Sequence, residues 1–233
     1  MTGAVNGAMS EEQARDAVVA AVRRLDALGM NRGSTGNASQ RWAVDGVDGM
    51  LITPTGMGAD DLRPQDMVWL SFDDGRVVGD WKPSSEWHFH QAIYRARPDL
   101  DAVVHTHSVQ AAALACLRRE LPAFHYMVAI AGGHDVPCVP YHLFGTEALS
   151  QTVAGAFASR DACLMANHGL VAAGPTLARA MKVAEETESL CEVYLKALAV
   201  GEPTVLSAAQ MDEVVAKFRG YGRTAAAAKP PER

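Results

Sequence analysis

Hydrophobic residues recur every three or four positions along much of the chain, which is the spacing of one face of an α-helix. The clearest case begins at Ser10, which forms a capping-box pattern with Gln13. Val18 and Leu25 continue its hydrophobic face, and Gly29 is the expected end. The same reasoning predicts helices after Ser84 or Ser85 as far as Pro98, and over 108–119, 146–158, 176–200 and 207–219.

Short β-branched and hydrophobic runs between these helices predict strands. We expect them at 39–44, 50–53, 67–72 and 76–79, in a central strand that starts at 102, and in a strand from 162 that ends at His168. The segments 33–37 and 123–141 are expected to be irregular, with short strand-like pieces in the second. Turn-forming residues join several strands as hairpins, so the pattern favours an α/β protein with an antiparallel or mixed sheet.

The length and composition fit one globular domain. The chain has 233 residues, of which 48% are hydrophobic, and it shows neither a repeat nor a linker. We therefore predict a single domain over 1–233, with flexible tails at 1–9 and 223–233. The four cysteines are scattered without Cys-x-x-Cys spacing, which is typical of the reduced thiols of a cytoplasmic protein.

Charge and hydropathy exclude two classes of partner. The formal net charge is −6, so the chain lacks the basic surface expected of a protein that binds nucleic acid or an anionic membrane. Neither a secretory signal pattern nor eighteen consecutive apolar residues is present. An anionic small molecule remains a possible ligand, because backbone N–H groups can bind phosphate whatever the overall charge.

The strand that starts at 102 ends in a His-x-His pair. Side chains alternate along a strand, so His105 and His107 should lie on the same face, about 6.6 Å apart. Two imidazoles at this spacing can share a metal ion. The alternative is a strand end with two unrelated histidines.

Two other segments carry candidate partners for this pair. Glu86 lies in the first turn of a predicted helix, where the helix dipole favours a carboxylate, and His168 lies where a strand gives way to Gly169. Glu86 is either a general base beside a metal or an ordinary helix residue, and His168 is either a ligand or a histidine at a strand end. Three neutral imidazoles on one Zn²⁺ would leave an open coordination position, as in catalytic sites.

Three loops contain small polar residues that could bind a phosphate through backbone N–H groups and hydroxyls. Taken singly, each is equally explained as a turn. The residues are Gly36, Asn37, Thr55, Gly56, Ser84 and Ser85.

Seven motifs, in this order, resemble the class II aldolase/adducin family from about residue 10 to residue 222. They are Thr35-Gly36-Asn37, Leu51-Ile52-Thr53-Pro54-Thr55-Gly56, Pro83-Ser84-Ser85-Glu86-Trp87, Val104-His105-Thr106-His107, His125-Tyr126-Met127, Ala131-Gly132-Gly133 and Asn167-His168-Gly169-Leu170. The resemblance implies three α/β/α layers around a mostly antiparallel sheet. It also implies a four-fold symmetric homotetramer with active sites at subunit interfaces.

The resemblance further implies roles for individual residues. His105, His107 and His168 would bind one Zn²⁺ per subunit, and Glu86 would be the acid/base group that also touches the resting metal. Tyr126 would act from a neighbouring subunit on the aldehyde oxygen. The six loop residues above would hold the substrate phosphate, and a tyrosine near the C-terminus, Tyr221, would help to close the site.

The implied reaction is reversible aldol cleavage of a ketose 1-phosphate, such as L-fuculose 1-phosphate, to dihydroxyacetone phosphate and an aldehyde. In condensation Glu86 would remove the proton next to the carbonyl, and a raised pKa would suit that task.

Other functions remain open at this point. Within the family they are an aldolase for a methylthio- or deoxy-sugar phosphate, a decarboxylase, and a pentulose-phosphate 4-epimerase, which would carry Asp where Glu86 stands. Outside this chemistry they are a zinc hydrolase, which would leave the three loops without a role, and a non-catalytic adducin-like scaffold, which would be expected to lack the metal ligands.

Overall fold

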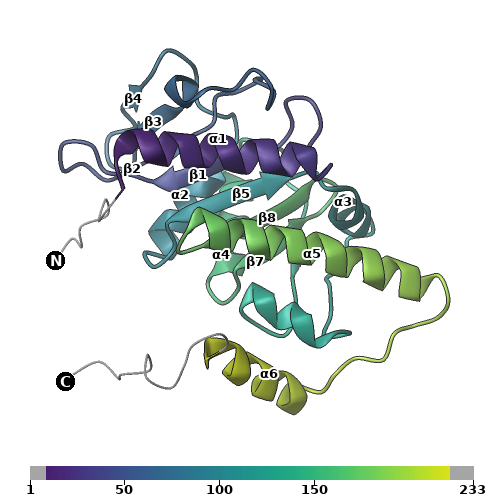
Figure 1. Ribbon diagram of the computed structural model, residues 1–233. Coiled ribbons are helices and arrows are strands. Elements are labelled where there is room, and N and C mark those ends of the chain that lie inside the picture. The colour runs from purple at the N-terminus through teal and green to yellow at the C-terminus, as the bar shows by residue number, and fades with distance from the viewer. Residues whose placement is uncertain (1–8, 221–233) are drawn as a thin grey trace, which may run out of the picture.

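The computed structural model describes residues 9–220 (Figure 1). Its longer helices fall where the hydrophobic periodicity predicts them. The elements in order are α1 Glu11–Ala27, β1 Asn37–Arg41, β2 Gly49–Ile52, η1 Pro64–Asp66, β3 Val68–Ser71, β4 Val77–Val78, α2 Trp87–Ala96, β5 Ala102–Thr106, α3 Val109–Cys116, η2 Tyr126–Ala131, β6 Cys138–Val139, α4 Glu147–Phe157, β7 Ala162–Met165, β8 Gly169–Gly174, α5 Leu177–Leu198 and α6 Ala208–Gly220.

One eight-stranded sheet forms the centre of the fold. Its strand order is β4-β3-β2-β1-β5-β8-β7-β6, and every neighbouring pair is antiparallel except β6 and β7. Hairpin connections account for the β1–β2, β3–β4 and β7–β8 pairs, because an antiparallel pair needs only a short turn. The prediction of a mostly antiparallel sheet is confirmed.

Helices cover both faces of this sheet, and Figure 1 shows α1 and α5 in front of the strands with α2 and α4 behind. Val104 and Ala172 face the side of α1, α3 and α5, whereas Val103 and Val171 face the side of α2 and α4. Because side chains alternate along a strand, each face receives its own hydrophobic cluster. The predicted three-layer arrangement is confirmed.

The register of the central strands brings distant parts of the sequence together. β1 and β5 pair so that Asn37 lies opposite His105, and β5 and β8 pair so that Thr106 lies opposite Leu170. A shift of one residue in either ladder would turn these side chains to the other face. The strand register therefore sets which residues meet at one end of the central strands.

Three details differ from the expectation. β1 begins at Asn37 and ends at Arg41, whereas a strand over 39–44 was expected, because Asn37 already pairs with β5. β8 was not predicted, since the four residues between its two glycines include only one β-branched residue, Val171, and lack a strong strand signal. α2 begins at Trp87, so its N-cap is Glu86 and not Ser84 or Ser85.

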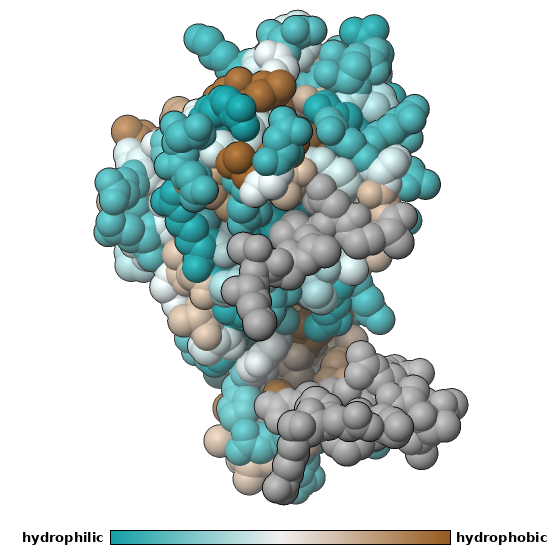
Figure 2. All heavy atoms as spheres, turned by 90° about the vertical axis from the view of Figure 1, so that its left-hand side faces the viewer, coloured by the Kyte–Doolittle hydropathy of each residue, from teal (hydrophilic) through white to brown (hydrophobic). Residues whose placement is uncertain are grey.

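The exposed surface is mixed. Figure 2 shows mainly hydrophilic residues on this face, with small separate hydrophobic areas. The edge strand β4 has only two residues, Val77 and Val78, and both are exposed. A short edge offers little template for pairing with another sheet. Of the helices within residues 9–220, none is long and apolar enough to cross a membrane.

The close approach of β5 and β8 makes Gly169 a sensitive position. A Cβ added there would lie 2.4 Å from the carbonyl oxygen of Thr106, which is backbone and cannot move aside. We expect Gly169→Ala to lower the free energy of unfolding by about 1–3 kcal/mol, as overpacking does. Urea unfolding measures this change.

Gly155 provides the control, because it is an exposed helical glycine whose added Cβ meets nothing within 4 Å. Gly155→Ala should raise the free energy of unfolding by about 0.5–1 kcal/mol through helix propensity. Equal effects of the two variants would contradict this account of the β5–β8 contact.

Candidate functional site

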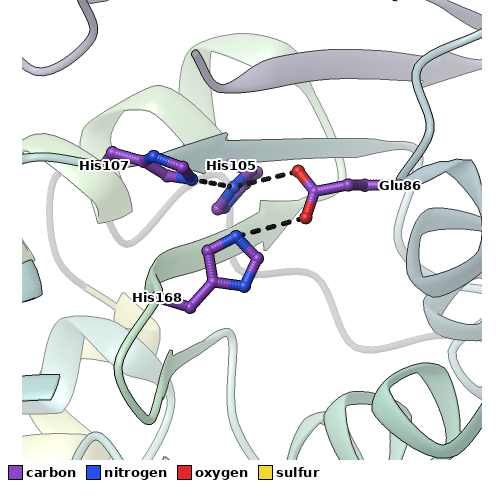
Figure 3. Close-up of side chains that lie close together, drawn as sticks. All are labelled: Glu86, His105, His107 and His168. Atoms are coloured by element: carbon purple, nitrogen blue, oxygen red, sulfur yellow. Dashed lines mark hydrogen bonds and ion pairs between the residues drawn. The ribbon is translucent and has the colours of Figure 1, made fainter. Parts of the chain in front are cut away.

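Four side chains that are far apart in the sequence converge at one end of the central strands (Figure 3). His105 lies in β5 and His107 directly after it, His168 lies in the turn between β7 and β8, and Glu86 precedes α2. Each offers one ligand atom, and these atoms all lie within 4.8 Å of one another. The structure thus brings together the residues predicted as metal ligands.

The distances fit a shared central ion. His105 Nε2 lies 3.0 Å from His107 Nε2 and 3.2 Å from Glu86 Oε2. Glu86 Oε1 lies 3.2 Å from His168 Nε2. Figure 3 shows the three rings and the carboxylate pointing toward one another. Such an arrangement of acceptor atoms requires either protons or a cation between them.

The backbone fixes which nitrogen of His105 faces this centre. His105 Nδ1 lies 2.9 Å from the carbonyl oxygen of Leu170, and a carbonyl only accepts, so Nδ1 carries the proton. In a neutral imidazole this leaves the lone pair on Nε2, which faces the other three groups. A hydrogen bond of this kind is the usual way in which a protein orients a metal-binding histidine.

The residues present fit a divalent transition metal. Glu86 Oε1 is buried and has no hydrogen-bond partner among the described residues, so it is left with unused acceptor capacity that a cation would satisfy. Three imidazole nitrogens and one carboxylate oxygen are a donor set that suits zinc and its neighbours better than calcium or magnesium.

The ionisation of the cluster follows from its crowding. Burial raises the pKa of Glu86, but the charges of His105 and His168, whose Nε2 atoms lie 3.2 Å from its two oxygens, outweigh burial and hold that pKa well below its ordinary value. The expectation of a raised pKa is therefore wrong. Burial, and then the neighbouring His105, lowers the pKa of His107 to about 4.

A cavity of about 370 Å³ opens beside the cluster. All six residues predicted to hold a phosphate line it, and so do three members of the cluster, Glu86, His107 and His168. His105 is fully buried and lies behind them. The three loops and the four-residue cluster thus face one space, which the sequence alone could only suggest.

The loops present neutral donors to this cavity, and within residues 9–220 neither lysine nor arginine lines it. Gly36 has a φ of +75°, and a Cβ there would also collide with the side chain of Asn31. Ser84 Oγ accepts from the N–H of Glu86 at 3.3 Å, which leaves its own proton for another acceptor. Backbone and hydroxyl donors of this kind can bind a phosphate without a charged side chain.

Of the two predicted tyrosines, Tyr126 is the one that falls within the described residues. Tyr126 opens η2, is 50% exposed, and does not line the cavity. Tyr221 lies outside the described residues. Neither position tests the predicted role.

The structure also places at the site residues to which the sequence assigns no role. Tyr141, His142 and Phe144, from the segment predicted to be irregular and the residues that follow it, line the cavity. Asn167 lines it too, with a φ of +55° that points to a constrained turn before His168. Helical spacing predicts that His90 shares a face with Glu86, and the sequence favours a structural or surface role for it; the structure shows His90 fully buried and hydrogen-bonded to Asn37.

Comparison with known proteins identifies the family. A model of the class II aldolase and adducin N-terminal domain matches residues 16–195. The chain belongs to the class II aldolase and adducin family. The resemblance drawn from the seven motifs is confirmed, and class II aldolases are metal-dependent enzymes, in agreement with the Glu/His cluster.

Two groups of aldolases, named for different substrates, are similar to this chain over most of its length. A 5-methylthioribulose-1-phosphate/5-deoxyribulose-1-phosphate aldolase of Rhodospirillum rubrum is 47% identical over 93% of this chain and 96% of its own length. An L-fuculose phosphate aldolase of Escherichia coli K12 is 45% identical over 84% and 89%. A solved L-fuculose 1-phosphate aldolase superposes with a TM-score of 0.85 at 36% identity, over 91% of this chain and 98% of that one. The chain is thus an aldehyde-lyase of this type.

The lowered pKa values predict how the stability of the metal-free protein depends on pH. The pKa of His107 is about 4 and that of His90, through burial, about 3, both below the ordinary value of about 6.5. Between pH 6.5 and 5 the unfolded chain therefore binds more protons than the native protein. The free energy of unfolding should fall by roughly 1–2 kcal/mol over this interval.

Urea unfolding in the presence of a chelator measures this slope. His107→Ala removes one of the two groups and should make the slope shallower. A free energy of unfolding that is independent of pH between 6.5 and 5 would contradict the neutral state of the buried imidazoles.

Proposed function

We propose that the chain is a zinc-dependent aldolase that reversibly cleaves a ketose 1-phosphate to dihydroxyacetone phosphate and an aldehyde. One observation carries the proposal: three imidazoles and a carboxylate converge beside a cavity whose other wall consists of small neutral loops. The cluster suits the reacting oxygens, and the loops suit a phosphate at the other end of the same molecule.

In this proposal the loops hold the part of the substrate that does not react. Gly36, Thr55, Gly56, Ser84 and Ser85 would donate to the phosphate oxygens from backbone N–H groups and hydroxyls. Asn37 would contribute the second hydrogen of its amide, because the first is donated to Glu86 at 3.0 Å. Binding energy from the phosphate would then orient the carbon chain against the cluster.

His105, His107 and His168 would hold one zinc ion, with Glu86 at the resting metal. When bound, the metal supplies Lewis-acid stabilisation of the negative charge that develops on the sugar oxygens. In condensation Glu86 would accept the proton from the carbon next to the carbonyl, and in cleavage it would return that proton to the same carbon. Its lowered pKa keeps it in the ionised form that accepts a proton.

Tyr126 would transfer a proton at the oxygen of the aldehyde from a neighbouring subunit. Its half-exposed side chain, outside the cavity of its own subunit, supports a role at another copy of the chain. We propose a homotetramer with four-fold symmetry and active sites at subunit interfaces, in which Tyr221 helps to close each site. The four free cysteines agree with a cytoplasmic location.

The substrate is proposed as a class. The 47% and 45% identities to relatives with different substrate names do not separate L-fuculose 1-phosphate from 5-methylthioribulose or 5-deoxyribulose 1-phosphate. All three would present the same phosphate end to the loops. They differ at the aldehyde end. We propose that Tyr141, His142 and Phe144, which line the remaining wall of the cavity, contact that end.

The proposal predicts that cleavage depends on a bound metal. The purified protein should contain about one zinc per subunit and release dihydroxyacetone phosphate from at least one of the three ketose phosphates. Removal of the metal by a chelator should abolish turnover, and added zinc should restore it. Metal analysis and a coupled assay for dihydroxyacetone phosphate measure both.

His107→Ala isolates the ligand role, because this side chain is partly exposed and its loss should leave folding intact. The variant should lose both metal and turnover. Full turnover after thorough chelation, or wild-type metal content in His107→Ala, would refute the proposal.

The position of Tyr126 predicts complementation between inactive subunits. Tyr126→Phe should lower turnover by about 10²-fold or more, as expected for a proton donor. If the tyrosine acts in a neighbouring site, hybrids of Tyr126→Phe and His107→Ala subunits contain some sites with both intact groups. An equal mixture, refolded together, should recover about one quarter of wild-type turnover.

The control is a mixture of each variant with itself, which should stay inactive. Hybrids without recovered turnover, shown by two affinity tags to contain both subunits, would place Tyr126 in its own subunit's site or outside catalysis.

A further inference from the structure

A line of polar side chains runs from Glu86 into the hydrophobic core between β1 and α2. Its members are Asn37, His90, Ser39 and Tyr94, and we call them the polar chain. Glu86, His90 and Tyr94 are spaced by four residues, so they share one side of α2 and the residue before it, and Asn37 and Ser39 are spaced by two on one face of β1. The two elements therefore meet with their polar residues facing one another.

Every link of the polar chain has hydrogen-bond geometry. Asn37 Nδ2 lies 3.0 Å from Glu86 Oε2, and Asn37 Oδ1 lies 2.5 Å from His90 Nε2. His90 Nδ1 lies 2.7 Å from Ser39 Oγ, which lies 2.8 Å from the hydroxyl of Tyr94.

The polar chain lies in hydrophobic surroundings, where polar side chains are unusual. Ser39, His90 and Tyr94 are fully buried, and the same interface contains Phe89 and Ile93 in the hydrophobic cluster beneath the sheet. Burying a polar group without a partner would cost about 1–3 kcal/mol, so a core of this kind is normally apolar. Here three polar side chains continue inward from the active-site carboxylate and satisfy one another.

The direction of the hydrogen bonds is fixed from one end to the other. An ionised Glu86 can only accept, so Asn37 must present its NH₂ group to Glu86 and its carbonyl oxygen to His90. His90 Nε2 must then carry a proton, and burial lowers the pKa of His90 to about 3, so the ring is neutral and Nδ1 is an acceptor. Ser39 therefore donates to His90, and Tyr94 donates to Ser39.

We propose that Ser39, His90 and Tyr94 are positioning residues that fix the orientation of the Asn37 amide and, through it, the carboxylate of Glu86. Without the Ser39 hydroxyl, His90 can adopt its other tautomer, with the proton on Nδ1. Nε2 would then repel the carbonyl oxygen of Asn37, and the amide would turn that oxygen toward the Glu86 carboxylate. Glu86 would lose one donor and gain a repulsive neighbour.

The inference rests on the proposed function, because its readout is the proton transfer assigned to Glu86. That step is measured alone as exchange of one carbon-bound hydrogen of dihydroxyacetone phosphate with deuterium from the solvent, without any aldehyde. In metal-loaded Ser39→Ala the exchange rate should fall by about 10- to 100-fold. The zinc content should stay close to wild type, because the three imidazoles are unchanged. The KM for dihydroxyacetone phosphate should rise less than the exchange rate falls, because Asn37 is the one loop residue of the six that the substitution affects.

Ser71→Ala is the matched control. Ser71 is a fully buried strand serine in β3, and its hydroxyl accepts hydrogen bonds from the backbone N–H groups of Asp73 and Asp74 and also bonds the Asp74 carboxylate. This variant should be destabilised without a change in exchange rate. If both serine variants lose exchange in proportion to their loss of stability, the polar chain is merely structural and the inference is overturned.

Two substitutions of His90 keep the test decisive if Ser39→Ala folds poorly. His90→Gln can place an N–H near the position of Nε2, so it should retain more exchange than His90→Leu, which removes the donor. Tyr94→Phe keeps the ring and should lower exchange less than Ser39→Ala does. Equal exchange rates in His90→Gln and His90→Leu would overturn the inference.

A spectroscopic measurement reports the tautomer directly. In ¹⁵N NMR of the zinc-loaded wild type, His90 should show a protonated Nε2 and an unprotonated Nδ1, and Ser39→Ala should shift this population. A protonated Nδ1 in the wild type would overturn the inference. Absence of deuterium exchange in the wild type would instead contradict the proposed function, so the two failures are distinguishable.

Discussion

The structure depends on how the buried carboxylate of Glu86 is compensated. Removing a carboxylate from water costs several kcal/mol unless charges or hydrogen bonds replace the lost hydration. Here the replacements come from three directions: His105 from the central strand, His168 from the turn between β7 and β8, and Asn37 from β1. A single side chain thereby links β1, β5, the turn between β7 and β8 and the start of α2, and the neighbouring histidines hold the pKa of Glu86 below its ordinary value.

This compensation explains why the sheet register matters more than any single loop. Asn37 reaches Glu86 because it lies opposite His105, and His105 keeps its Nε2 toward the centre because the carbonyl of Leu170 takes the proton on Nδ1. Both relations are set by ladder pairings in the rigid centre of the fold. Precise sites are built on such elements, since packed strands hold side chains more firmly than loops do.

The sequence predicted the helices, the antiparallel sheet and the members of the Glu/His cluster because each leaves a local pattern or a recognisable motif. His90 shows the limit of that reasoning. Its spacing from Glu86 predicts a shared helix face, but its hydrogen-bond partners Asn37 and Ser39 lie 53 and 51 positions earlier in the chain. They belong to a strand that begins at Asn37, whereas the sequence predicted a start at residue 39. The prediction of a raised Glu86 pKa failed for a similar reason. Burial alone raises this pKa, but the histidines that lower it come from distant segments of the sequence.

The division of the cavity follows from the same electrostatics. A metal held by the imidazole cluster beside Glu86 would already provide positive charge at the proposed reacting end, so a lysine or arginine among the loops would compete for the carboxylate and for the substrate oxygens. Neutral donors would avoid this competition and could still bind a phosphate, and neither basic residue is among the described residues that line the cavity. The separation between a charged end and a neutral end would let a ketose phosphate bind in only one direction, with its reacting carbons at Glu86.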